Sequence, residues 1–149
     1  MEKNETLNVK GHISLWLVGP NGELKESREI QNVIVTAGKA FLAQWLTAAT
    51  QADYFMRYIA LGTGTNAASA SDTTLQTEIG TRVAGALTNS TNTWQNQATF
   101  GAGVSTGAIT EAGIFSASSS GTMFARQVFA VVNKAAGDSL QITWSVTFS

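Results

Sequence analysis

The alternation of apolar and polar residues along the chain predicts β-strands over most of its length. The pattern is clearest in residues 139–148, where every second residue is large and apolar and those between are Ser, Gln or Thr. A period of two places all the large side chains on one face of a strand. Val9–Val18 alternates in the same way, and Pro20-Asn21-Gly22 is a strong turn signal before a second strand at Glu23–Val35. The N-terminal part of the chain is therefore expected to form a hairpin.

One segment has the period of a helix instead. Thr36–Ala49 carries an apolar stripe, and Thr36 is a suitable N-cap. A short helical turn is expected at Asp72–Ile79. The stripe residues of the helix are Phe41, Leu42, Trp45 and Leu46.

The remaining strands and the turns between them indicate the fold class. Short strands separated by Gly, Ser and Asn turns are typical of an antiparallel sandwich or jelly roll. We therefore expect a mainly β fold, an antiparallel β-sandwich resembling a jelly roll, with one covering helix at about residues 36–49. The further strands are expected at Tyr54–Leu61, Arg82–Leu87, Thr93–Phe100, Ala108–Ser116 and Met123–Val132.

Length and charge bear on the domain organisation. The chain has 149 residues, which favours a single domain over residues 1–149. Charged residues make up 13% of it, against roughly 25% in an average protein, and about half of them lie in residues 1–30. This segment, extended to about residue 35, is expected to be a charged hairpin or arm that faces solvent and is distinct from the body.

Composition also excludes several classes of function. The chain has no cysteine, which excludes thiol catalysis and thiolate metal sites, and its one histidine, His12, cannot form a His-based zinc site within one chain. The net charge of −1 gives no reason to expect nucleic acid. No apolar run approaches the ~20 residues of a membrane span. We therefore expect no metal, no cofactor, no nucleic acid and no membrane.

Two glycine-rich motifs resemble catalytic or nucleotide-binding loops but lack essential parts. Gly103–Gly107 matches the G-x-S-x-G pattern of serine hydrolases, yet no helix is expected after it and His12 lies far upstream. Gly62-Thr63-Gly64-Thr65 lacks the Lys-Ser/Thr ending of a phosphate-binding loop. The first is interpreted as a β-turn and the second is not expected to be a nucleotide site. We expect no catalytic residues and no enzymatic activity.

Glu111 is the most unusual carboxylate, because it lies inside an otherwise apolar strand. A buried or interface carboxylate requires a partner. Arg57, Arg82 and Arg126 are the arginines available in the body, and one of them is expected to pair with Glu111 for structure rather than catalysis. Solvated surface positions are expected for the other carboxylates of the body, Asp53, Asp72, Glu78 and Asp138.

The four tryptophans suggest two different roles. Trp16, Trp45 and Trp144 lie in strongly patterned segments and are expected to pack in the core. Trp94 lies among polar residues, which makes it the candidate for contact with a sugar or a protein partner.

Several segments follow one another in a characteristic order over residues 30–149: Asn32–Gly38, Ala60–Thr65, Thr73–Leu75 with Glu78, Thr110–Phe115, and Asn133-Lys134 before the last strand. This order resembles small β-rich structural proteins of tailed bacteriophages, most of all capsid decoration (cement) proteins. The resemblance implies a protein made in the host cytoplasm that binds the outer surface of the mature capsid in the virion. It would form a homotrimer and stabilise the head by bridging subunits of the major capsid protein.

The charged hairpin is expected to contribute to this contact, so that deleting residues 1–30 would abolish capsid binding and leave the body folded. A tail, baseplate or fibre-associated structural protein, with carbohydrate binding through Trp94, is the alternative. The residues expected at the interface are Lys10, His12, Lys25, Arg28, Trp94 and Glu111.

Overall fold

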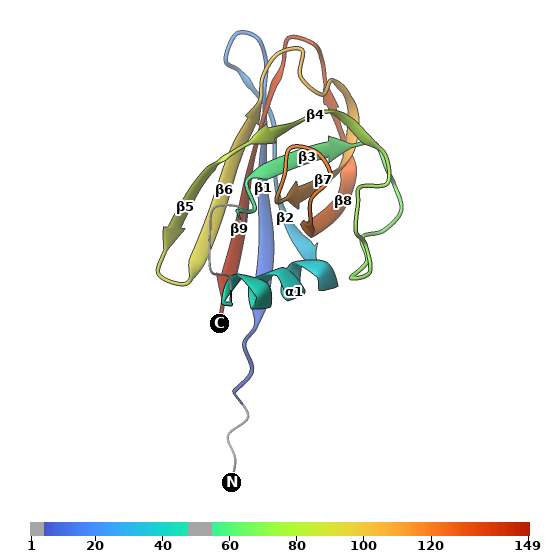
Figure 1. The fold of residues 1–149 in the computed structure, drawn as a ribbon. Coiled ribbons are helices and arrows are strands. Elements are labelled where there is room, and N and C mark those ends of the chain that lie inside the picture. The colour runs from blue at the N-terminus through green and yellow to red at the C-terminus, as the bar shows by residue number, and fades with distance from the viewer. Residues whose placement is uncertain (1–4, 48–54) are drawn as a thin grey trace.

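The computed structural model describes residues 5–47 and 55–149 and confirms a mainly β, antiparallel fold with one helix among them (Figure 1). The elements in chain order are β1 (Val9–Val18), β2 (Leu24–Ile34), α1 (Thr36–Trp45), β3 (Tyr58–Gly62), β4 (Glu78–Ala84), β5 (Ala86–Ser90), β6 (Thr93–Phe100), β7 (Gly107–Phe115), β8 (Met123–Lys134) and β9 (Ser139–Phe148).

The strands form two layers that share β2. Their order is β4-β3-β7-β8-β2-β1-β9-β6-β5, and every pair is antiparallel. The first layer contains β5, β6, β9, β1 and β2, and the second contains β8, β7, β3 and β4. Figure 1 shows that β3 and β4 cross the long strands of the first layer at a steep angle, as in orthogonal packing of sheets.

The two ends of this strand order lie close together. β4 and β5 are separated in the chain by Gly85 alone, and the Gly85 N–H donates a hydrogen bond of 2.8 Å to the Arg57 carbonyl. On the other side, β2 pairs with β1 along most of its length and with β8 only at Val33 and Ile34. The strand order is therefore nearly closed, although β2 and β8 separate beyond Val33 and Ile34.

The core lies between the two layers. The alternation in β9 has the predicted result, because Leu140, Ile142, Trp144 and Val146 are all fully buried. They belong to one apolar cluster with inward residues from all the remaining strands except β5. Among these residues are Ile13, Leu15, Phe100, Ile59, Ile109 and Val132. Burying each such side chain contributes about 1.5–3 kcal/mol, so this face supplies most of the driving force for folding.

The charged N-terminal hairpin is an integral part of the sandwich, which corrects the expectation of a separate arm. β1 pairs with β9 from Val9 to Val18, so it lies inside the first layer. Its inward residues Ile13 and Leu15 are fully buried. The charged residues concentrate here because the outward positions of the hairpin face solvent.

The helix is shorter than predicted and begins differently. α1 ends at Trp45, and its N-cap is Val35 with no side-chain hydrogen bond, so the expected Thr36 cap is wrong. Gly38 brings α1 against β8, because a Cβ atom at this position would collide with the Phe124 carbonyl.

The segment between β3 and β4, residues 63–77 (the β3–β4 loop), is extended and turning where a helical turn had been expected. It covers the outer surface of the second layer. A second, small apolar cluster lies beneath it: Val35, Ala60, Leu75, Phe115 and Met123.

Candidate functional site

Glu111 lies at the centre of a buried network that joins β7 to the β3–β4 loop. Its side chain is fully buried. Oε1 accepts hydrogen bonds from the N–H groups of Gly64 (3.0 Å) and Thr77 (2.7 Å). Oε2 accepts from the N–H of Gln76 (3.1 Å) and from Nε of Arg126 (2.9 Å). Both carboxylate oxygens are therefore engaged within the fold.

Arg126 extends the network to a second carboxylate. Its Nη2 lies 2.8 Å from Oε2 of Glu111, and its Nη1 lies 2.7 Å from Oδ2 of Asp72. Nη2 also donates to the Asn66 carbonyl at 3.1 Å. The expectation that an arginine of the body pairs with Glu111 is confirmed, and the partner is Arg126.

The electrostatics of the network favour charged groups. Burial by itself raises the pKa of Glu111, but hydrogen bonds from backbone N–H groups of the β3–β4 loop and from Arg126 outweigh it, and the net pKa is lowered. Burial likewise raises the pKa of Asp72, while bonds from the Ser69 N–H and from Arg126 lower it further than burial raises it. A general acid at neutral pH requires a raised pKa, so these carboxylates suit structure rather than proton transfer.

The glycine motif at the start of the loop makes room for the Glu111 carboxylate. A Cβ atom at Gly62 or at Gly64 would lie 2.5 Å from Oε1 of Glu111. The N–H groups that could have cradled a phosphate are instead used inside the protein, by Glu111 at Gly64 and by the Gln76 side chain at Thr65 (2.9 Å). The motif therefore fastens the loop to the sheet.

Two further carboxylates of the body, Glu78 and Asp138, are also paired with cations. Glu78 bonds Arg82 at 2.8 Å, and the Arg82 guanidinium lies 3.6 Å from the centroid of the Phe115 ring. Asp138 is buried, contrary to expectation, and bonds Lys25 at 2.8 Å. Asp53 lies outside the described residues.

The G-x-S-x-G segment is a turn before β7, as its sequence context predicted. Gly103 has φ 76° and Gly107 has φ 137°, conformations that favour glycine. The Ser105 hydroxyl donates a hydrogen bond of 3.4 Å to the Ile79 carbonyl. A strand follows, where a nucleophile elbow requires a helix.

Three of the expected interface residues are engaged within the fold: Glu111, which is fully buried, Lys25 and Arg28. Lys25 holds Asp138 in the loop between β8 and β9. Arg28 donates to the Ala130 carbonyl and, at 2.8 Å, to the Val131 carbonyl of β8. Because β2 and β8 pair only at the other end of β2, Arg28 bridges the two strands where they have separated.

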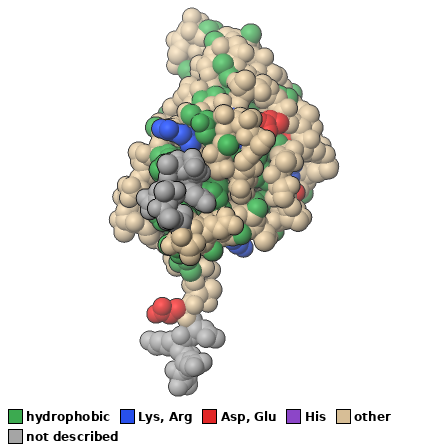
Figure 2. All heavy atoms as spheres, in the orientation of Figure 1, with side chains coloured by type: hydrophobic (Ala, Val, Ile, Leu, Met, Phe, Trp, Pro, Cys, Tyr) green, Lys and Arg blue, Asp and Glu red, His purple; other side chains and the backbone are tan. Residues whose placement is uncertain are grey.

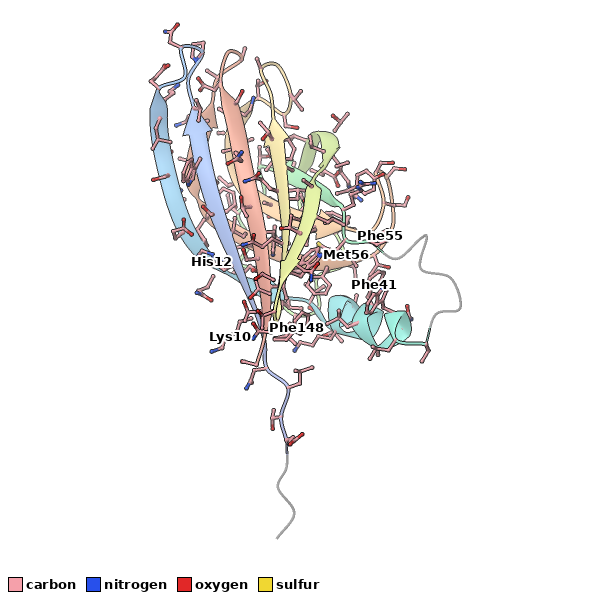
Figure 3. All side chains as sticks on the ribbon, turned by 90° about the vertical axis from the view of Figure 1, so that its left-hand side faces the viewer. Lys10, His12, Phe41, Phe55, Met56 and Phe148 are labelled. Carbon is pink, nitrogen blue, oxygen red and sulfur yellow. The ribbon has the colours of Figure 1, made fainter. Side chains whose placement is uncertain are left out.

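Lys10 and His12 lie on the outer side of β1, directed away from the interior (Figure 3). Lys10 is exposed, and Nε2 of His12 lies 3.0 Å from a carboxylate oxygen of Glu29. Within the residues that the structure describes, no three carboxylate or histidine side chains gather as metal ligands. The described chain also contains no helix long and apolar enough to cross a membrane.

An apolar cavity of about 510 Å³ opens at the end of the sandwich next to α1. This volume is within the roughly 300–1,000 Å³ of small-molecule sites. Figure 3 shows Phe41, Phe55, Met56 and Phe148 gathered between α1 and the strands. The described lining residues carry no charge, and half of them are aromatic: Phe41, Trp45, Phe55, Trp94, Phe124 and Phe148.

The tryptophans divide differently from the prediction. Trp94 forms part of the cavity wall, half-buried, with its ring centroid 6.0 Å from that of Phe124. Trp144 is buried as predicted, but Trp16 and Trp45 are 48% and 40% exposed, so core positions were wrong for both. Trp16 projects from the first layer, and Trp45 borders the cavity.

The outer side of the first layer is uncharged over three adjacent strands. β5, β6 and β9 contain no charged residue, and their outward side chains are mostly Gln, Thr and Ser. We call these outward side chains, with the adjacent Trp16 of β1, the neutral face. Hydrogen bonds join its two central strands in a ladder: Thr93 with Thr147 (3.0 Å), Gln95 with Ser145 (3.0 Å) and Gln97 with Thr143 (3.1 Å).

Low charge extends to the other side of the molecule. Figure 2 shows few charged side chains there, with apolar side chains scattered among polar ones.

Sequence reasoning missed the cavity and the neutral face for different reasons. The cavity combines α1, residues 55–56 and four strands, which no local pattern brings together. The neutral face could have been found, because the alternation in β6 and β9 already separates Thr, Gln and Ser from the apolar residues. Comparison of the chain with protein-family models, with curated proteins and with solved structures finds no match.

Proposed function

We propose that this chain is a capsid decoration protein of a tailed bacteriophage, which binds the outside of the mature head as a homotrimer and bridges subunits of the major capsid protein. The neutral face is the single observation that carries the proposal. The order of sequence motifs supports it, because that order resembles decoration proteins. The protein acts by binding rather than by catalysis, and its carboxylates serve the fold.

The neutral face shares its lack of charge, and the exposed Trp16, with protein interfaces. Interface cores are depleted of charged residues and enriched in aromatic ones. On β6 and β9 the outward polar groups already donate hydrogen bonds to one another. A partner can therefore cover this surface without burying an unpaired charge. Trp16 is 48% exposed beside this surface, and tryptophan is among the residues that contribute most to binding.

Such an interface would stabilise the shell by mass action. A protein that binds only the assembled capsid, across two subunits, adds its binding free energy to the assembled state alone. A rigid body suits this role, because little conformational entropy is lost on binding. The nearly closed sheet and the buried Glu111–Arg126 pair support that rigidity.

The test is the copy number of the protein in purified particles of the phage that encodes it, after heads are separated from tails. We expect hundreds of copies on heads by quantitative mass spectrometry. A few copies on tails would contradict decoration and favour the alternative below. Absence from both fractions would overturn both proposals.

A pair of variants then tests the neutral face itself. Gln97→Arg places a charge on the exposed outer side of β6 and is expected to abolish binding to capsids that lack the protein. Asn133→Arg places the same charge at an exposed position of β8, in the second layer. This variant is expected to bind as the unmodified protein does. Equal binding by both variants would exclude the neutral face.

A tail, baseplate or fibre component is the second candidate, and the aromatic cavity is the observation that favours it. Aromatic side chains provide stacking surfaces for sugar rings, and exposed Thr88 and Asn89 add polar groups at its rim. We expect glycan-array binding that Trp94→Ala removes if this candidate is correct. No glycan binding by the unmodified protein would dismiss the carbohydrate function.

A further inference from the structure

Exposed apolar side chains concentrate at the end of the molecule next to α1. Trp45 is 40% exposed, Leu46 is 79% exposed and Phe55 is 48% exposed, and they lie at or beside the mouth of the aromatic cavity. Large apolar patches on a soluble protein mark surfaces that a partner covers. The cavity has no described charged residue in its wall, so its occupant must be apolar.

The N-terminal segment, residues 5–8, leaves the body at this same end. Figure 1 shows it extending beyond β1 and past the level of α1. It carries Leu7, which is 70% exposed. An apolar side chain on an extended segment thus lies beside an apolar cavity that it does not fill.

Leu7 is not part of the cavity wall of its own chain: it is 70% exposed, and the described lining does not include it. The Asn8 N–H donates to the Ser149 carbonyl at 2.5 Å, and the Ser149 N–H donates to the Asn8 carbonyl at 2.9 Å. This pairing fixes the chain at the residue next to Leu7, directly beyond Phe148, which lines the cavity.

We propose that the occupant is a second copy of this chain, and that Leu7 of one copy inserts among Trp45, Phe55 and Trp94 of the next. Every copy has one donor segment and one acceptor cavity, so the contact is head-to-tail. Such contacts close into rings when the rotation permits. Charge agrees with this arrangement, because Glu5 precedes Leu7 while Lys39 and Arg57 are exposed beside the cavity.

This inference rests on the proposed function for the homotrimer, but its tests use the purified protein, so its failure would leave the expected copy number on heads unchanged. The absence of cysteine from the chain allows a direct test. Two differently tagged chains, one with Leu7→Cys and one with Thr88→Cys at the cavity rim, are co-expressed and treated with a short bismaleimide. We expect cross-linked dimers that carry both tags, and no such dimers when Leu24→Cys, at the other end of the molecule, replaces Leu7→Cys.

The double variant with Leu7→Cys and Thr88→Cys in one chain separates exchange from folding back. Cross-links between chains support the proposal, whereas cross-links only within one chain overturn it. No cross-link in the co-expressed pair would also overturn it.

Analytical ultracentrifugation gives an independent measurement. We expect the unmodified protein to associate, and Leu7→Asp to weaken that association at least about tenfold because the buried leucine is lost. Leu24→Asp, which changes another exposed leucine, is the matched control. A monomeric unmodified protein, or equal association by Leu7→Asp, would contradict the proposal. Circular dichroism should be the same for all three proteins, since Leu7 is not part of the core.

Discussion

The Arg126 guanidinium and the Glu111 carboxylate form a buried ion pair of 2.8 Å on adjacent strands beneath the β3–β4 loop. The same guanidinium holds Asp72 of the loop, and the same carboxylate accepts three loop N–H groups. One pair of side chains therefore fastens a 15-residue segment without regular structure to the sheet, together with the buried Leu75.

Replacing Arg126 should destabilise the protein severely. Arg126→Met keeps the aliphatic stem and removes the charge, which leaves Glu111 buried without its cation. Breaking a buried pair in this way costs about 3–5 kcal/mol of unfolding free energy, a large part of the stability of an ordinary domain. Urea denaturation followed by tryptophan fluorescence measures the loss.

Arg57→Met is the control, since Arg57 is exposed and a surface substitution changes stability by about 0.5 kcal/mol or less. If both variants unfolded at the same urea concentration, the network would not hold the loop.

The same network should make the protein sensitive to acid. The folded-state pKa values of Glu111 and Asp72 are lowered from 4.5 and 3.8. A lowered pKa contributes stability that is complete above the ordinary value and is lost as the pH falls through the folded-state value. We therefore expect the midpoint temperature of thermal unfolding to be constant near neutral pH. It should decrease when the pH is lowered below about 4.5.

Glu111→Gln should be less stable at neutral pH and show a shallower decline in acid, because one titrating group has been removed. An acid profile as steep as that of the unmodified protein would exclude Glu111 as a contributor.

The sequence predicted those features that depend on local alternation. Residues 139–148 were recognised as a strand because every inward side chain of β9 is large, and Glu111 was recognised as paired because a charge inside an apolar strand has few alternatives. The choice among three arginines required the register of β7 and β8, which brings Arg126 opposite Gly113, two residues from Glu111.

Features that depend on distant contacts were missed. The pattern of β1 separates its faces correctly, but it does not show that the face with Trp16 has no covering layer. The Thr36–Ala49 pattern predicted a longer helix, whereas α1 ends at Trp45. The spacing of Trp45 and Leu46 was read as helical, although it is equally compatible with side chains that border an open cavity.

Two N-terminal deletions should distinguish the role of the hairpin from that of the segment that precedes it. Deleting residues 1–30 removes β1 from the middle of the first layer, so we now expect an unfolded chain rather than a folded body without binding. Deleting residues 1–7 leaves β1 complete and should preserve the fold. Circular dichroism and heteronuclear NMR spectra of the two proteins test this, and a folded product of the longer deletion would contradict the topology.

Arg28 should contribute to the stability of the fold, whereas Lys10 should not. Both residues were expected at the interface with the capsid. Arg28→Ala removes donors from two carbonyls of β8 and is expected to cost about 1–3 kcal/mol. Lys10→Ala changes an exposed side chain and should cost about 0.5 kcal/mol or less. Urea denaturation compares the two, and hydrogen exchange should show faster opening of β8 in Arg28→Ala alone. Equal stability of both variants would return Arg28 to the list of interface candidates.

Trp16 should be the strongest single contributor to particle binding if the neutral face is the contact surface. It projects between Ser27 of β2 and Gln141 of β9, both polar, so a partner must supply the apolar surface that would cover it. Tryptophan is enriched among interface residues whose loss costs at least 2 kcal/mol, and Trp16→Ser should therefore weaken binding to capsids about 30-fold or more.

The folded chain should tolerate this change, because Trp16 lies outside the core. Val131→Ser, at an apolar position of β8 that is 43% exposed, is the control and should bind normally. Co-sedimentation of labelled protein with capsids measures both variants. Normal binding by Trp16→Ser would show that the capsid contact lies on another surface. Loss of binding by both variants would show that exposed apolar residues contribute to capsid binding on either face of the molecule.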